Sequence, residues 1–300
     1  MVKGEISVKI KESFGRKLFL AIDAIILIGI SLVCLYPILY VLFASISNGN
    51  LLMAHRGVLV KPLGFTIEVY KKILGYPLLL NSYLNTLKII GITLVFNILL
   101  TSFGAYFLSR KNVVGGNLVM MLILITMYFN GGLIPNYMLV KWLNLTNTHW
   151  ALILPVALNT YNLIVLKTAF ASVPDSLCEA AKIDGAGHFR ILFRIVMPLS
   201  KASIAVIILY YMVAQWNSWF SAMIYIDNRT LYPLQLLLKE MLIQNDTSSM
   251  TQGITDGDMQ AVSETMKYAI IVVATLPILC IYPYLQKYFT KGVMVGAVKG

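Results

Sequence analysis

The chain has 300 residues, of which 58% are hydrophobic and 12% are charged, and its mean hydropathy is +0.77. This composition is typical of a protein embedded in a lipid bilayer, and it excludes most soluble enzymes. The net charge of +11 does not indicate nucleic-acid binding, because long apolar stretches separate the basic residues. We therefore expect contact with membrane lipid and none with nucleic acid.

The cysteines and histidines favour no metal site and no catalytic site. Cys34, Cys178 and Cys280 have no Cys-x-x-Cys spacing, and two of them lie in apolar runs. We interpret all three as packing residues rather than as disulfide or zinc ligands. The three histidines show no metal-binding spacing, and no Ser or Cys is arranged as an activated nucleophile.

Six stretches without Asp, Glu, Lys or Arg are long enough to cross about 30 Å of hydrocarbon. They predict an all-α, polytopic membrane protein with six transmembrane helices. The expected spans are 20–46, 89–109, 117–138, 149–170, 202–225 and 268–287. A shorter charge-free run, 73–87, contains Gly75 and Pro77 and is expected outside the membrane or at its interface. Basic residues precede the first span, as they precede the apolar region of a signal peptide. The span is too long for such a region and contains Pro37, so we expect it to be retained.

The basic residues indicate the orientation of the chain. With the N-terminus inside, 15 of the 24 Lys and Arg residues fall on the cytoplasmic side, as the positive-inside rule requires. Both termini are then cytoplasmic. Residues 172–200 form a cytoplasmic segment, 227–267 an extracellular loop and 288–300 a cytoplasmic tail.

Amide and aromatic side chains gather in the third to fifth spans, where lipid could not satisfy their polar groups. Amides bond sugar hydroxyls and aromatic faces stack on sugar rings, so these residues are candidates for a polyol pathway. Two alternatives stay open, since Trp and Tyr also anchor helices at the interface and buried amides also join helices. The candidates are Asn130, Asn159, Tyr161, Tyr211, Gln215, Trp216, Asn217 and Trp219.

Residues 172–200 are predicted to form a helix, a turn and a second helix. Pro174 and Asp175 suit a first helical turn, and residues 179–182 form a good helix-forming run. Gly185 and Gly187 permit a sharp turn. Apolar residues then recur at helical spacing up to Pro198.

This segment resembles the signature of the membrane subunits of binding-protein-dependent ABC importers. The signature is Glu179-Ala180-Ala181, three residues, Gly185, nine residues, and Ile195-Val196-Met197-Pro198, where Met197 replaces the usual Leu. Residues 216–220 and 131–137 resemble the carbohydrate branch, which comprises the maltose-type and lipoprotein/oligosaccharide-group permeases. Residues 292–300 resemble the tail of the maltose-type subunits. The resemblance implies the type I ABC importer permease fold in a bacterial cell membrane.

The resemblance also implies partners and roles. A short helix near 174–186 would dock on an ATPase subunit, with Glu179 offering a carboxylate to a basic residue there and Ala180 and Ala181 allowing close approach. Asp184, Gly185 and Pro198 complete the expected coupling residues, and Gly296, Lys299 and Gly300 are expected to contact the ATPase from the tail. The expected partners are a second permease forming a heterodimer, two ATPase subunits, an extracellular solute-binding protein and a sugar, expected to be an oligosaccharide.

The sequence contains no Gly-x4-Gly-Lys-Ser/Thr motif, so we expect ATP and Mg²⁺ in the partner subunits and no cofactor on this chain. The chain is accordingly expected to be a transport subunit and not an enzyme. An ion- or proton-driven secondary carrier is the main alternative, although Asp23 is the single acid near a span. A receptor or structural membrane protein is a further alternative, which leaves the spacing of residues 179–198 unexplained.

Overall fold

The computed structural model describes residues 14–111, 113–243 and 256–297, and within them every regular element is a helix. The first part of the chain holds α1 (Phe14–Ser45), α2 (Gly49–Ala54), α3 (Glu68–Leu74), α4 (Pro77–Ser109), α5 (Gly116–Tyr128), α6 (Leu133–Trp142), α7 (Trp150–Ile153), η1 (Leu154–Val156) and α8 (Thr160–Ala171). The second part holds α9 (Asp175–Ile183), α10 (His188–Ile191), η2 (Leu192–Val196), α11 (Met197–Leu199), α12 (Lys201–Trp216), α13 (Phe220–Tyr225), η3 (Arg229–Leu231), α14 (Leu234–Ile243) and α15 (Asp256–Ala297). The predicted all-α membrane fold is confirmed.

Three helical segments are long and apolar enough to cross a membrane alone, namely α1, α4 and residues 261–281 of α15. Three bent pairs also meet the length and composition criteria: α5 with α6, α7–η1 with α8, and 188–199 with α12. The expected number of six spans is reached if each bent pair forms one span. The placement of the individual spans relative to the membrane stays a prediction.

One compact unit contains residues 14–69 and the first part of α15, up to Val272. Asn48 caps α2, because its side-chain oxygen accepts a hydrogen bond from the backbone N–H of Asn50 at 3.1 Å. Gly49 lies so close to α15 that an added Cβ would be 2.1 Å from the carbonyl oxygen of Ala261. The Tyr40 and Tyr268 rings pack edge to face at 5.7 Å. This small core leaves most of α1 exposed, as expected of a helix that faces lipid or another subunit.

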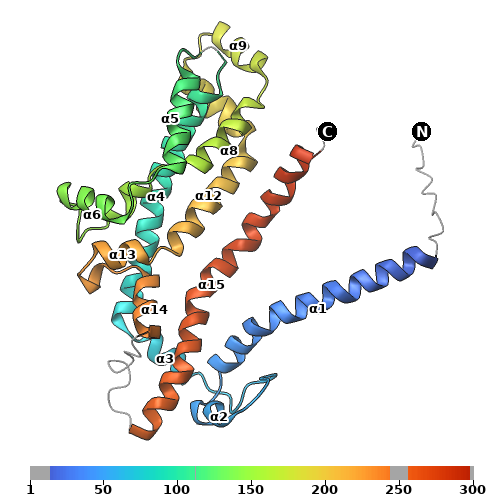
Figure 1. The fold of residues 1–300 in the computed structure, drawn as a ribbon, viewed down its shortest axis with the longest axis vertical. Helices are drawn as coiled ribbons and strands as arrows, with labels where there is room; N and C mark the ends of the chain where they lie inside the picture. Colours follow the sequence, from blue (N-terminus) through green and yellow to red (C-terminus); the bar gives the residue numbers. More distant parts are fainter. Residues whose placement is uncertain (1–13, 112, 244–255, 298–300) are drawn as a thin grey trace. The chain divides into compact units, whose positions relative to one another are not determined.

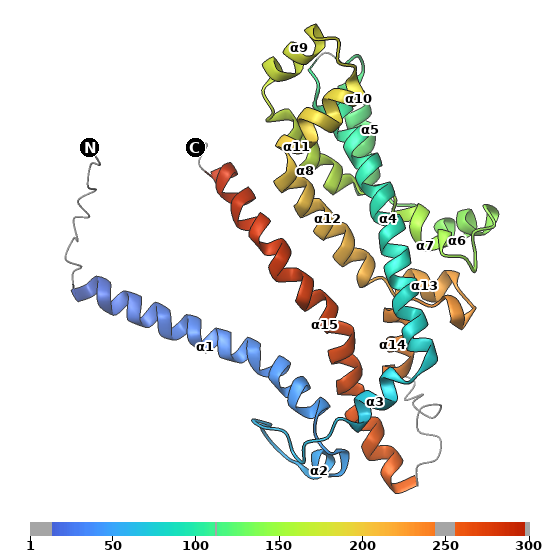
Figure 2. The same ribbon diagram turned by 180° about the vertical axis from the view of Figure 1, so that it is seen from behind.

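The second unit contains residues 70–243 and the remainder of α15. Its centre is a bundle in which α4, α5, α8 and α12 run side by side, with α9 at one end (Figures 1 and 2). Around that end, Leu166, Phe170 and Ile191 are fully buried in one apolar cluster. A second cluster joins α4 and α7 to α13 and the start of α14. Two apolar cores therefore pack against α4, one around its middle and one toward its C-terminal end.

Residues 77–87 of the charge-free run 73–87 form the first turns of α4, and their expected place outside the membrane or at its interface stays a prediction. Pro77 occupies the first helical position, where its missing N–H costs nothing. The amides of this run are satisfied by protein: Asn85 Nδ2 donates to the carbonyl oxygens of Thr230 at 2.8 Å and Tyr232 at 3.2 Å. A helix of 33 residues is about 50 Å long and exceeds the hydrocarbon thickness.

The segment 227–267, predicted as an extracellular loop, includes helices, and its extracellular location stays a prediction. It contains η3, α14 and the first turns of α15, while residues 244–255 lie outside the described residues. Of the three cysteines, Cys178 is buried, whereas Cys34 and Cys280 are exposed on α1 and α15, so the packing role is supported at Cys178 and stays a prediction at the other two. All three are free thiols.

The break between α5 and α6 follows from its sequence. Gly132 has φ +89°, which favours glycine, and its N–H donates to Asn130 Oδ1 at 2.9 Å. Pro135 then lies in the first turn of α6. The two helices meet at 112°, so the amide-rich segment is a sharp bend rather than part of a straight span.

Candidate functional site

Residues 172–200 form the predicted helix, turn and helix. α9 ends at Ile183, and the chain turns at Gly185, whose φ of +77° is left-handed, while Gly187 has φ −72°. α10, η2 and α11 then continue as one helical run that includes Pro198. The local structure of the prediction is confirmed, whereas its cytoplasmic location stays a prediction.

α9 has one face against the bundle and one face free. Cys178 is buried and Ala181 is half-buried against the cluster around Phe170. Glu179 and Ala180 are exposed, and Ile183 is 86% exposed. Ile183 is thus an exposed apolar side chain, and Glu179, one turn earlier, is an exposed carboxylate at the cavity between α4 and α9, so both are accessible to a partner. Of the two alanines expected to allow close approach, Ala181 contacts the chain's own core.

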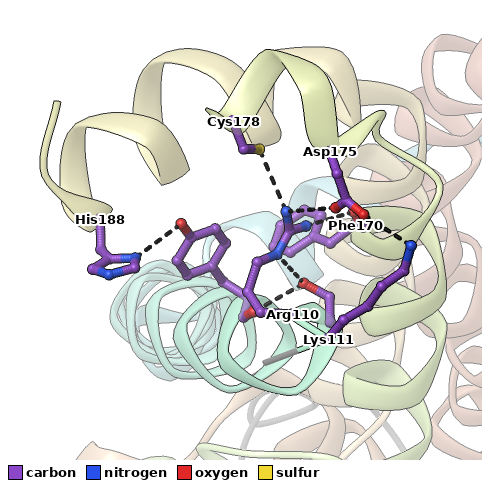
Figure 3. A network of polar contacts seen from close by, with 8 residues as sticks. Arg110, Lys111, Phe170, Asp175, Cys178 and His188 are labelled. Atoms are coloured by element: carbon purple, nitrogen blue, oxygen red, sulfur yellow. Dashed lines mark hydrogen bonds and ion pairs between the residues drawn. The ribbon is translucent and has the colours of Figure 1, made fainter. Parts of the chain in front are cut away.

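Arg110, the residue that follows α4, connects α4 to α8 and α9 (Figure 3). Its Nη2 donates to the carbonyl oxygen of Phe170 at 2.9 Å, and its Nη1 lies 3.4 Å from Cys178 Sγ. Nη1 is also 3.7 Å from Asp175 Oδ1, and the guanidinium carbon is 5.2 Å from the Tyr106 ring centre. The guanidinium thereby satisfies a carbonyl in the last turn of α8 and contacts the first turns of α9.

Lys111 makes a second, exposed tie to α9. Its Nζ lies 2.9 Å from Asp175 Oδ2, and its side chain is 83% exposed. The hydrogen bond and charge of Lys111 lower the pKa of the Asp175 carboxyl, and the same hydrogen bond raises the pKa of Lys111. Both groups are therefore ionised at neutral pH.

The same end of α4 also contacts α10. The Tyr106 hydroxyl and His188 Nδ1 are 3.3 Å apart, and the Phe103 ring packs edge to face on Phe189 at 5.8 Å and Phe193 at 6.1 Å. Between α4 and α9 lies a cavity of about 710 Å³ that Arg110, Asp175, Glu179 and His188 help to line. The segment is thus attached to α4 through both of its helices.

A smaller, partly open cavity of about 270 Å³ lies where α4, η1 and α12 meet. Its described lining carries amide and hydroxyl groups and no charged side chain. The lining residues are Thr93, Asn97, Pro155, Val156, Leu158, Asn159, Tyr211, Ala214, Gln215 and Ser218. Three of the predicted pathway residues, Asn159, Tyr211 and Gln215, are therefore brought together.

The other predicted pathway residues lie elsewhere. Asn130 is at the α5–α6 bend, and Tyr161 is 52% exposed with its ring 6.4 Å from that of Tyr210. Trp216 is 3% exposed and packs near Tyr83, with ring centres 6.4 Å apart. Asn217 Nδ2 donates to the Val213 carbonyl at 2.8 Å. Trp219 packs in the cluster of α7 and α13, and Lys239 Nζ lies 3.0 Å from its ring centre.

Sequence reasoning missed the contribution of α4 to this cavity. Thr93 Oγ1 and Asn97 Oδ1 are buried, and neither has a hydrogen-bond partner among the described residues. Unsatisfied buried polar atoms are costly, which indicates that water or a ligand completes them. A signal was present: polar residues recur on one face of the helix at helical spacing, at Ser82, Thr86, Thr93, Asn97 and Thr101.

The structure leaves the tail residues largely untested. Gly296 lies in the last turn of α15, and Lys299 and Gly300 lie outside the described residues. Within the described part of the chain, no group of three or more His, Cys, Asp or Glu side chains could hold a metal ion.

Comparison with known families agrees with this architecture. Residues 12–295 match the family described as the binding-protein-dependent transport system inner membrane component. The chain belongs to this family. The resemblance first seen in residues 179–198 is confirmed over almost the full length of the chain.

Relatives of this inner membrane component are found among bacterial transport proteins. The Bacillus subtilis polygalacturonan/rhamnogalacturonan transport system permease protein YtcP is 38% identical, over 91% of this chain and 96% of that protein. Protein LplC of the same organism is 39% identical, over 91% and 92% of the two chains. A solved bacterial ABC transporter involved in import of the acidic polysaccharide alginate has a TM-score of 0.85 and 30% identity, over 94% of this chain and all of that one.

Proposed function

We propose that the chain is one permease subunit of an ATP-driven importer that moves an oligosaccharide across a bacterial cell membrane. The observation that carries the proposal is the accessibility of α9, on which Glu179 and Ile183 are both exposed while Arg110 ties the helix to α4. A docking helix joined to a membrane helix is what an energy-coupling subunit requires. The second permease, two ATPase subunits and an extracellular solute-binding protein complete the proposed complex.

The proposed coupling follows from the two faces of α9. Glu179 pairs with a basic residue of the ATPase, and Ala180 and Ile183 pack against its surface. When the ATPase subunits close on ATP, α9 moves with them, and the bundle opens the pathway outward to receive solute from the binding protein. Asp184, Gly185 and Pro198 shape the segment, and Gly296, Lys299 and Gly300 are proposed as tail contacts with the ATPase.

A carbohydrate substrate is supported by two observations. YtcP, GanQ and AraQ are named for transport of polygalacturonan/rhamnogalacturonan, galactooligosaccharides and arabinooligosaccharides, and the solved relative is involved in the import of alginate. The cavity lined by Asn97, Tyr211 and Gln215 offers amides and hydroxyls, which suit sugar hydroxyls. We assign this cavity to the solute pathway.

We further propose that this subunit binds no nucleotide, because its sequence lacks the Gly-x4-Gly-Lys-Ser/Thr motif. ATP and Mg²⁺ then belong to the partner subunits, and the chain itself is not an enzyme. Both termini are placed in the cytoplasm, on the same side as α9, on the strength of the Lys and Arg distribution.

The test is purification of the tagged chain from its native membrane in mild detergent, with every stoichiometric partner identified by mass spectrometry. The proposal expects a second permease and an ATPase in fixed ratio. A Glu179→Lys variant of the chain should keep the second permease and lose the ATPase. Recovery of the wild-type chain alone in several detergents would favour the ion-driven carrier instead.

A further inference from the structure

Arg110 is the best-connected charged side chain at the α9 end of the bundle. Only 15% of its side chain is exposed. It donates through Nη2 to Phe170 in α8 and through Nε to Ser109 in α4, and its Nη1 contacts Cys178 and Asp175 in α9. One planar guanidinium therefore contacts three helices, which a lysine ammonium at the same place could not reproduce.

The neighbouring Lys111 provides a natural contrast. It shares the partner Asp175, but its side chain is 83% exposed, and its ion pair links only the end of α4 to α9. Exposed ion pairs contribute little to holding two helices together, because water and salt screen them. Arg110 thus makes a largely covered contact with three helices, whereas Lys111 makes an exposed ion pair.

We propose that Arg110 is a positioning residue that transmits movement of α9 to α4. The inference rests on the function proposed above, in which the ATPase moves α9. Arg110 locks the first turn of α9 to the end of α4, so the two move together rather than sliding past each other.

Helix α4 connects Arg110 to the residues that line the smaller cavity. Asn97 and Thr93, which line the smaller cavity, are on α4, and Arg110 directly follows the last residue of this helix. At 1.5 Å per residue they lie about 20 Å and about 25 Å along the axis from it. A rigid helix held at Arg110 therefore carries a displacement of α9 directly to the wall of the cavity.

Apolar packing alone is the competing account. Cys178 and Ala181 pack against the cluster around Phe170, and this contact could hold α9 without Arg110. The two accounts differ in what a loss of Arg110 does. If apolar packing alone holds α9, replacing Arg110 should leave coupling unchanged. If Arg110 links α9 to α4, the replacement should leave the complex assembled, but ATP hydrolysis should no longer respond to the binding protein.

The experiment compares Arg110→Met, Arg110→Lys and Lys111→Gln in the whole complex, reconstituted in proteoliposomes with its binding protein and an oligosaccharide that the binding protein retains. ATP hydrolysis with and without the loaded binding protein, and sugar taken up per ATP, are the readouts. We expect Arg110→Met to assemble in normal stoichiometry but to lose about tenfold in binding-protein stimulation and in uptake per ATP. Arg110→Lys should recover little, and Lys111→Gln should stay within about twofold of wild type.

If Arg110→Met assembles poorly, a covalent cross-link between α4 and α9 can stand in for the Arg110 contacts. Lys111→Cys and Asp175→Cys, with the three native cysteines replaced by alanine, allow a short bis-maleimide to tie α4 to α9. Cross-linking should restore uptake per ATP in the Arg110→Met background.

Two results would overturn the inference while leaving the proposed function intact. The first is that the wild-type complex shows ATP-driven uptake and the Arg110→Met complex takes up as much sugar per ATP. The other is a cross-linked Arg110→Met complex that assembles and stays uncoupled. Absence of ATP-driven uptake in the wild-type complex would instead contradict the proposed function itself.

Discussion

The Tyr211 hydroxyl of α12 lies 2.8 Å from the Thr101 hydroxyl of α4 and accepts a hydrogen bond from the backbone N–H of Asn159 at 3.1 Å. One phenol thus joins two membrane helices and the residue that caps α8. Because this contact is buried beside the cavity, it fixes the relative position of the elements that form the cavity wall.

Tyr211→Phe is expected to destabilise the subunit by about 1–3 kcal/mol, because Thr101 and the Asn159 N–H lose a buried partner. Thermal unfolding of the purified complex should show the loss. Tyr161→Phe removes a hydroxyl from a half-exposed ring and should leave the unfolding temperature unchanged. Equal unfolding temperatures for Tyr211→Phe and wild type would refute the role of this contact.

Thr93→Val is expected to reduce sugar uptake without reducing the stability of the subunit. Its hydroxyl has no partner among the described residues, so an isosteric methyl should leave the free energy of unfolding unchanged or raise it slightly. If the hydroxyl serves the solute pathway, sugar uptake should nevertheless fall while basal ATP hydrolysis persists. Thr101→Val is the matched control, since it breaks the bond to Tyr211 and should lower stability. Unchanged uptake by Thr93→Val would remove this hydroxyl from the pathway.

The turn after α9 offers a comparison within one loop. Gly185 has φ +77°, and Gly187 has φ −72°, while an added Cβ meets no atom within 4 Å at either position. Gly185→Ala should therefore cost about 1–2 kcal/mol through backbone strain alone, and Gly187→Ala should not. Reduced coupling in Gly185→Ala, measured as sugar uptake per ATP, with wild-type behaviour in Gly187→Ala, is the expected result. Similar effects from both would show that the turn conformation is not the cause.

Glu179→Lys is expected to leave membrane insertion intact and to uncouple ATP hydrolysis from transport, because it reverses the charge on the exposed face of α9. Glu179→Gln should have a smaller effect, since it removes the charge and keeps the shape. Arg190→Glu is an equally exposed charge reversal on α10 and serves as the control. Normal uptake in Glu179→Lys would show that the ATPase docks elsewhere.

The Lys111–Asp175 pair sets a pH expectation. The hydrogen bond and charge of Lys111 lower the pKa of Asp175 below the ordinary value of 3.8. The stabilisation that the pair provides is therefore fully present above pH 3.8 and is lost as the pH falls through the lowered pKa. Between about pH 5 and 8 the difference in uptake between wild type and Asp175→Asn should therefore be constant. A difference that changes across this range would assign the pair a pKa near neutrality and contradict this account.

The sequence predicted the fold class and the helix–turn–helix because both depend on local signals. Charge-free runs mark apolar helices, and the spacing from Glu179 to Pro198 is a short-range pattern. The sequence did not indicate that α4 begins as early as Pro77, where Asn81 and Asn85 donate to the carbonyl of Thr230. Those contacts are about 150 residues apart in the chain and have no local signature.

The candidate sites were predictable to different degrees. Asn159, Tyr211 and Gln215 stood out as polar residues in apolar runs, and the structure brings them to one cavity. Trp216 stood out equally but is buried beside Tyr83, so Trp216→Ala is expected to reduce ATP hydrolysis and uptake together. Arg110 carried no sequence signal, because a basic residue at the end of a span is ordinary.

The central claim is that ATP hydrolysis, and no ion gradient, drives an oligosaccharide through this permease. The most direct measurement is uptake of a labelled oligosaccharide into proteoliposomes that hold the purified complex, with ATP inside and loaded binding protein outside. The account predicts uptake that requires ATP and the binding protein and that persists when ionophores collapse every ion gradient. Uptake that needs a proton or sodium gradient and ignores ATP would contradict it.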